Sequence, residues 1–98
     1  MKPNTIVTLV MTTGAEIIGR LVKDEFSTVV IYKPRLVQAT QQGVGLVNGI
    51  SMTGIEINEE FEFPKTSVAY IVETMKELAD GWTQQTSGIA LPTGGLIK

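Results

Sequence analysis

Three carboxylates near the middle of the chain form its densest group of residues able to carry acid–base chemistry. Glu59, Glu60 and Glu62 lie within a stretch of four residues. Glycoside hydrolysis uses a pair of carboxylates that flank the scissile bond. Such a pair needs a concave scaffold large enough to hold a sugar, and this short alternating segment implies none. We therefore interpret the three carboxylates as the solvated face of a strand and predict no catalytic residue.

Other chemistry is restricted by the residue types that the chain lacks. It has no histidine, which is the commonest general base near neutral pH and the commonest metal ligand. It has no cysteine either, which removes disulfides and thiolate nucleophiles. Gly43-Val44-Gly45 precedes a strand-like run rather than a helix, so it is a poor phosphate-binding loop. We expect no enzymatic activity, no metal site and no cofactor.

Length and charge narrow the class of protein. The chain has 98 residues, 43% of them hydrophobic, and a formal charge of −2, which fits one globular domain spanning 1–98. A dedicated duplex-DNA binder carries a strong basic balance, whereas a single-stranded nucleic acid needs only a local basic patch with stacking surfaces. No apolar stretch approaches the ~20 residues of a membrane span. We expect a cytoplasmic protein, and the absence of cysteine fits a reducing compartment.

Short β-branched runs predict a curved β-sheet in the first three quarters of the chain. Gly14 supplies the positive φ of a hairpin turn, and Gly19, inside a strand, indicates a bulge or sharp bend. Lys33 and Arg35 flank Pro34, and we interpret them as a solvated edge. Five or six short strands predict a small barrel, because closure removes exposed edges. The expected strands are 5–12, 16–23, 28–38, 44–50, 55–63 and 67–73.

After the last strand the hydrophobic period changes from that of a strand to that of a helix. The segment 74–86 has apolar residues at helical spacing, with Thr74 as N-cap and Glu77 as its capping-box partner. Trp82 lies on the apolar side, so we expect it in the core rather than free to stack on a base. The glycine-rich segment 87–98 is expected to be flexible.

Two groups of residues in the predicted strands and turns have a recognisable spacing. They are Val7-x-Leu9, Gly14, Gly19-x-Leu21 and Asp24-Glu25-Phe26 at the start, and Phe63-Pro64-Lys65-Thr66 before the last strand. This spacing resembles that of the Sm-like family, the small β-barrel proteins of the Sm, LSm and Hfq type. The match covers roughly 6–73, and the helix with 87–89 is similar to small Sm-like chains encoded by marine phages. The resemblance implies a mainly β fold, a strongly bent five-stranded barrel with a short C-terminal helix.

The resemblance also implies partners. In the family, edge strands of neighbouring subunits pair and close a ring, so the expected assembly is a homo-oligomeric ring of about five to seven copies. Single-stranded RNA would bind at repeated pockets built from the turn after the second strand and the turn before the last. Repetition of weak pockets around one ring would supply the affinity through avidity.

Carried over residue by residue, the resemblance names five RNA-binding candidates. Phe26 would stack on a base, and Lys65 would meet a phosphate, with Thr66 as the small turn residue beside it. Ser27-Thr28 replace the family's Met-Asn, and a hydroxyl cannot make the bidentate contact of an amide, so base selectivity should be weaker. Asp24, with the two glycines, would be a structural turn residue that bonds to the backbone.

Two other readings of the same residues stay open. Phe26 could pack at the barrel rim, and Lys65 could be an ordinary solvated turn charge. The acidic run Glu56–Glu62 and the missing amide favour an alternative function, an oligomeric protein-interaction or structural module without nucleic-acid binding.

Overall fold

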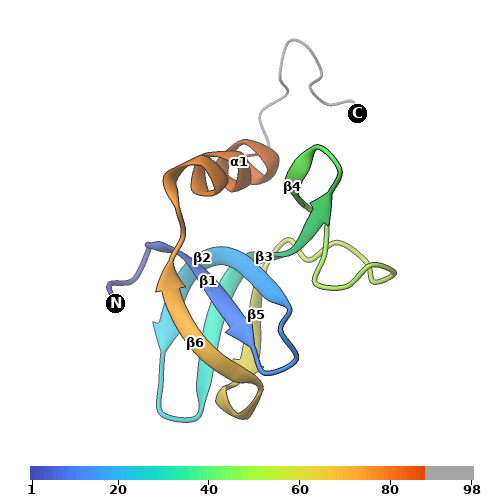
Figure 1. Cartoon of the computed structure of the whole chain (residues 1–98). Helices are drawn as coiled ribbons and strands as arrows, with labels where there is room; N and C mark the ends of the chain where they lie inside the picture. The colour runs from blue at the N-terminus through green and yellow to red at the C-terminus, as the bar shows by residue number, and fades with distance from the viewer. Residues whose placement is uncertain (88–98) are drawn as a thin grey trace.

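The structure of the chain is a computed structural model that describes residues 1–87. In this part six strands form one sheet, and a short helix lies at one end of it (Figure 1). The mainly β fold with a short C-terminal helix is confirmed, with six strands in place of five. The tail predicted to be flexible, 87–98, lies outside the described residues from position 88 onward. The elements are β1 (Ile6–Met11), β2 (Glu16–Asp24), β3 (Thr28–Thr40), β4 (Gly43–Leu46), β5 (Glu60–Pro64), the 3₁₀ turn η1 (Lys65–Ser67), β6 (Val68–Glu73) and α1 (Lys76–Thr86).

The strands follow the order β4-β3-β2-β1-β6, every pair is antiparallel, and β5 pairs with the first half of β3. β3 has 13 residues and pairs with three strands: with β2, with β5 along its first half and with β4 along its second half. The sheet curls into a small, partly open barrel (Figure 1). Within residues 1–87, β5 and β6 do not pair with each other. One side of each of these strands is therefore left without a partner in the isolated chain.

Two glycines shape the barrel as the sequence predicts. Gly14 adopts φ +94° in the β1–β2 hairpin, whose turn is closed by the Gly14 amide donating to the Met11 carbonyl at 2.9 Å. At Gly19 the β2–β3 register shifts, which marks a bulge. A Cβ at Gly19 would collide with the Ile31 side chain and lie 3.0 Å from the Tyr32 carbonyl oxygen. The strands can approach this closely only because position 19 has no side chain.

Two apolar clusters lie on opposite faces of the curved sheet. The barrel interior is filled by side chains that alternate along the strands, and helix α1 covers the outer face. There Trp82 is 3% exposed and Ile18 is 1% exposed, so the predicted core position of Trp82 is confirmed. The interior cluster consists of Val7, Leu9, Ile17, Leu21, Val29, Ile31 and Phe63.

Lys33 of β3 makes two hydrogen bonds to the helix, in addition to the bond from the Gln85 side-chain amide of the helix to the Leu46 carbonyl of β4 at 3.3 Å. The φ of Lys33 is +51°, an unusual value for a residue with a side chain. The Trp82 indole N–H donates to the Lys33 carbonyl at 2.8 Å, and the Lys33 ammonium donates to the Thr86 carbonyl at 2.8 Å. The Lys33 amide also donates to the Glu59 carbonyl at 3.1 Å. These bonds hold a backbone conformation that would otherwise be strained.

The prediction of a solvated Arg35 is wrong, because this side chain is 1% exposed. Its guanidinium donates to the Ile57 carbonyl at 2.6 Å, to Asn58 Oδ1 at 3.1 Å and to Glu56 Oε2 at 3.2 Å. Burial lowers the pKa of Arg35, and the Glu56 carboxylate partly opposes that shift. The planar guanidinium with its several donors thus organises the loop that faces it.

That loop replaces most of the strand predicted over 55–63. Only Glu60–Pro64 is a strand, and Ile55, which alternation over 55–63 would place opposite the carboxylates, is 86% exposed. Residues 56–58 turn toward Arg35, because one carbonyl and two side-chain oxygens of this stretch accept hydrogen bonds from its terminal nitrogens. The preceding strand is likewise shorter than the predicted 44–50, since it ends at Leu46.

The capping-box spacing predicted Thr74 as the N-cap of the helix, and this prediction is wrong. The N-cap is Met75, which makes no side-chain capping bond. The Thr74 amide still donates to the Ile6 carbonyl at 3.0 Å, so this residue continues the β1–β6 ladder and cannot take the cap position. Its hydroxyl shares a buried 2.8 Å hydrogen bond with the Thr8 hydroxyl.

Replacing Gly19 with alanine should destabilise the domain by about 1–3 kcal/mol, because the added methyl group overpacks the β2–β3 contact. The matched control is Gly45→Ala, where nothing lies within 4 Å of the new Cβ. Urea unfolding of both variants provides the measurement. Equal midpoints for the two would show that the bend does not depend on glycine.

The buried Thr8–Thr74 pair predicts a non-additive result. Thr8→Val or Thr74→Val alone should cost about 1–3 kcal/mol, because each leaves one buried hydroxyl without its partner. The double variant removes both hydroxyls at nearly constant shape and should be closer to wild type than the sum of the singles. Additive losses of unfolding free energy in a double-mutant cycle would contradict this hydrogen bond.

Candidate nucleic-acid interface

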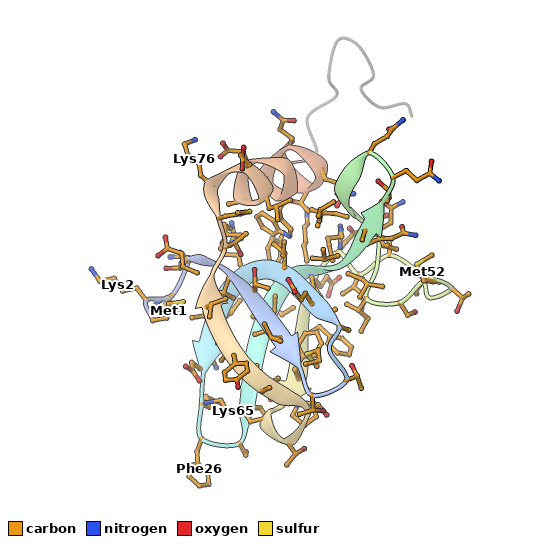
Figure 2. All side chains as sticks on the ribbon, viewed as in Figure 1. Met1, Lys2, Phe26, Met52, Lys65 and Lys76 are labelled. Atoms are coloured by element: carbon orange, nitrogen blue, oxygen red, sulfur yellow. The ribbon has the colours of Figure 1, made fainter. Side chains whose placement is uncertain are left out.

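The two turns that the sequence predicts to form the RNA site lie side by side at one end of the barrel. β5 pairs with the start of β3, so that Pro64 is opposite Thr28. One residue further on, the Lys65 amide donates to the Ser27 carbonyl at 2.9 Å. Figure 2 shows Phe26 and Lys65 at this same end of the molecule. The β2–β3 turn and η1 therefore form one continuous surface.

Phe26 is at the tip of the β2–β3 turn and is 100% exposed. The turn beneath it is closed by the Glu25 amide, which donates to the Thr28 carbonyl at 2.9 Å. The Phe26 ring points away from the barrel (Figure 2). The alternative that this side chain packs at the barrel rim is therefore wrong for the isolated chain. A fully exposed aromatic ring on a closed turn is available to stack on a flat partner.

The cation of the site is already paired. The Lys65 ammonium and the Asp24 carboxylate form an ion pair, and each side chain is about one third exposed, at 32% and 35%. Asp24 was expected to fix the turn through backbone bonds, but its carboxylate contacts η1 instead. The pair joins the end of β2 to η1 through side chains, in addition to the backbone bond between Lys65 and Ser27.

The remaining candidates surround this ion pair. Ser27 and Thr66 are exposed, and Thr28 is half-buried at the first position of β3. Their hydroxyls can each donate and accept a hydrogen bond. Lys23, Asp24, Glu25 and Lys65 are the charged residues on the two turns, so the local charge is balanced. A phosphate at Lys65 would have to compete with Asp24.

A second surface of interest, an exposed apolar strip on β6, was not found in the sequence. Tyr70 is 68% exposed and Val72 is 46% exposed, and Met75, just beyond the strand, is 61% exposed. The β1–β6 register shifts between Val10 and Met11, so that both Val68 and Ile71 pack on the interior cluster. Strict alternation cannot predict which residues a bulged strand exposes.

Comparison with protein-family models finds no match, and comparison with curated protein sequences finds none either. The described residues contain no helix that is both long and apolar enough to cross a membrane. They also contain no group of three or more carboxylates that could hold a metal ion. The features of the described residues that bear on function are the two adjoining turns and the two strands, β5 and β6, that lack a partner on one side.

Proposed function

We propose that this chain is an Sm-like, ring-forming protein that binds single-stranded RNA at the junction of the β2–β3 turn and η1. The observation that carries the proposal is that Phe26, fully exposed, shares one surface with Lys65. Proteins that bind single-stranded nucleic acid combine an aromatic side chain, on which a base stacks, with a cation that contacts the phosphate. We propose a cytoplasmic location, because a chain without cysteines needs no oxidising compartment for disulfide formation.

The first step of binding is exchange of partners at Lys65. A phosphate oxygen replaces the Asp24 carboxylate on the ammonium, and Asp24 turns to solvent. Both side chains are partly exposed, so the broken pair costs little, on the order of 1 kcal/mol or less. Stacking of one base on Phe26 then supplies the larger contribution, about 1–3 kcal/mol per base. The Thr28 hydroxyl offers a single hydrogen bond to a base edge, which gives weak selectivity.

Self-association is supported by the two strands that lack a partner on one side. β5 and β6 pair with β3 and β1 but not with each other, and unpaired strand edges recruit further strands. Pairing of β5 in one copy with β6 in the next would be a head-to-tail contact, which gives a ring when the rotation between successive copies closes. It would also cover part of the apolar strip formed by Tyr70, Val72 and Met75. The ring repeats a weak RNA site, and avidity then raises the overall affinity.

Phe26→Ala should weaken binding of a labelled U-rich or A-rich single strand at least about fivefold, because it removes the stacking surface. Lys65→Ala should lower both the affinity and its dependence on salt. Asp24→Asn should strengthen binding, because it removes the carboxylate that competes with phosphate. Fluorescence anisotropy at low and moderate salt gives all three dissociation constants.

The matched control for these variants is Ile55→Ala, which also truncates an exposed apolar side chain but lies away from both turns. Its affinity should equal that of wild type. RNA binding at this site would be refuted by absence of binding at low salt, or by equal losses in Phe26→Ala and Ile55→Ala.

Charge on the free edge of β6 should dissociate the assembly. Light scattering should give wild type a mass that is a multiple of 10.6 kDa, and Tyr70→Lys with Val72→Lys should shift it toward 10.6 kDa. Desolvation of two ammonium groups opposes burial of the strip. Met52→Lys, at an exposed loop position, should leave the mass unchanged. A monomeric wild type would rule out the ring.

A further inference from the structure

The outer face of β2, β3 and β5 carries two rows of side chains, each with a cation at one end and a carboxylate at the other. The rows follow the registers of β3 with β2 and with β5, in which directly paired residues point to the same face. They alternate along the strands with Ile31 and Phe61, which pack in the barrel interior, so the rows face outward. The two charged rows are Arg20–Tyr32–Glu60 and Lys23–Val30–Glu62.

The charges of these rows have no partner of opposite sign within residues 1–87. None of them belongs to an ion pair there. Neighbouring strands are 4.7–4.9 Å apart, so β3 separates the cations on β2 from the carboxylates on β5 by about 10 Å. Lys23, Glu60 and Glu62 are exposed. Arg20 is half-buried, with its guanidinium carbon 4.5 Å from the centroid of the Tyr32 ring. Its N–H groups remain free to donate to a carboxylate.

The order of the charges makes this face complementary to itself. A twofold axis parallel to β3 exchanges the β2 side of one copy with the β5 side of a second copy and keeps each position along the strand. Arg20 then faces Glu60 of the second copy, and Lys23 faces Glu62 of the second copy. Because the operation is symmetric, every cation meets a carboxylate and no like charges face each other.

The curvature of the barrel fits this arrangement. Two convex faces meet along one strand and diverge on either side of it. Tyr32 and Val30 are half-buried residues of the central strand β3, and they lie where the two faces meet. The long charged side chains are on the flanking strands, where the gap is wider. Ile18, which α1 covers, precedes the bend at Gly19, whereas the charged rows begin after it.

We propose that the charged rows form a twofold interface between two copies of this chain. The contact uses the outer faces of β2, β3 and β5, whereas the proposed ring uses the free edges of β5 and β6, so either can exist without the other. Ion pairs between exposed side chains are weak and are screened by salt. The association is therefore expected at high protein concentration and at low salt.

The test is sedimentation equilibrium over a concentration series in the Tyr70→Lys, Val72→Lys background, in which charge blocks pairing of the free edge of β6. The mass should rise from 10.6 kDa toward twice that value as the protein concentration increases. The dissociation constant of the dimer should be at least about fivefold higher at moderate than at low salt. A mass that stays at 10.6 kDa at every concentration would overturn the proposal.

An exchange of charge within one row identifies the interface. Lys23→Glu alone and Glu62→Lys alone should each raise the dissociation constant at least about tenfold, because like charges then face each other twice across the twofold axis. The two changes in one chain should restore association, because opposite charges again face each other. Both positions are exposed strand residues, and Arg20 keeps its place on the Tyr32 ring.

Lys76→Glu is the matched control, because it reverses an exposed lysine on α1, away from the charged rows. It should leave the dissociation constant unchanged. Equal constants for Lys23→Glu and Lys76→Glu, or failure of Lys23→Glu with Glu62→Lys to restore association, would overturn the proposal.

Discussion

The close approach of β2 to β3 at Gly19 is the constraint on which the remaining structure depends. There the Ile31 side chain and the Tyr32 carbonyl occupy the space that a side chain would need. The resulting bulge bends β2 and β3 together, so that the interior residues face one another instead of lying on a flat layer. The bend also allows β3 to carry β5 along its first half. Through β5 it sets the position of η1, and hence of Lys65, beside the β2–β3 turn.

The chain separates its charges into regions with different chemistry. The turn end of the barrel has balanced charge and one exposed ring, whereas the loop before β5 and the β5 strand are acidic. A buried cation, Arg35, stabilises this loop from inside by donating to Ile57, Asn58 and Glu56. Its removal would leave the oxygens of the loop without donors. One guanidinium thus determines the shape of a surface to which it contributes no exposed charge.

Local signals in the sequence were sufficient for β1, β2, β3 and β6 and for the two turns of the candidate site. Gly14 has the positive φ that its hairpin turn requires, Gly19 marks a bulge in β2, and the polar residues from Asp24 onward end that strand. The prediction failed where a distant residue decides the local structure. The alternation over 55–63 is typical of a strand, but the donors of Arg35 require most of it as a loop. Thr74 has the spacing of an N-cap, but pairing with β1 retains it in the ladder. Exposure of Tyr70 and Val72 depends on a bulge, which alternation does not encode.

Lys33 joins three parts of the molecule, because it lies in β3 and bonds both to α1 and to Glu59 in the loop before β5. The cluster beneath the helix, with Ile18 and Trp82, is on the opposite face of the sheet from the residues that fill the barrel. The backbone of Lys33, at positive φ, is held by the two bonds to α1, and its amide donates to Glu59 of the acidic loop. Arg35, two residues further along β3, donates to Glu56, Ile57 and Asn58 of the same loop. The helix and the acidic loop thus share one three-residue stretch of β3 as their point of contact with the sheet.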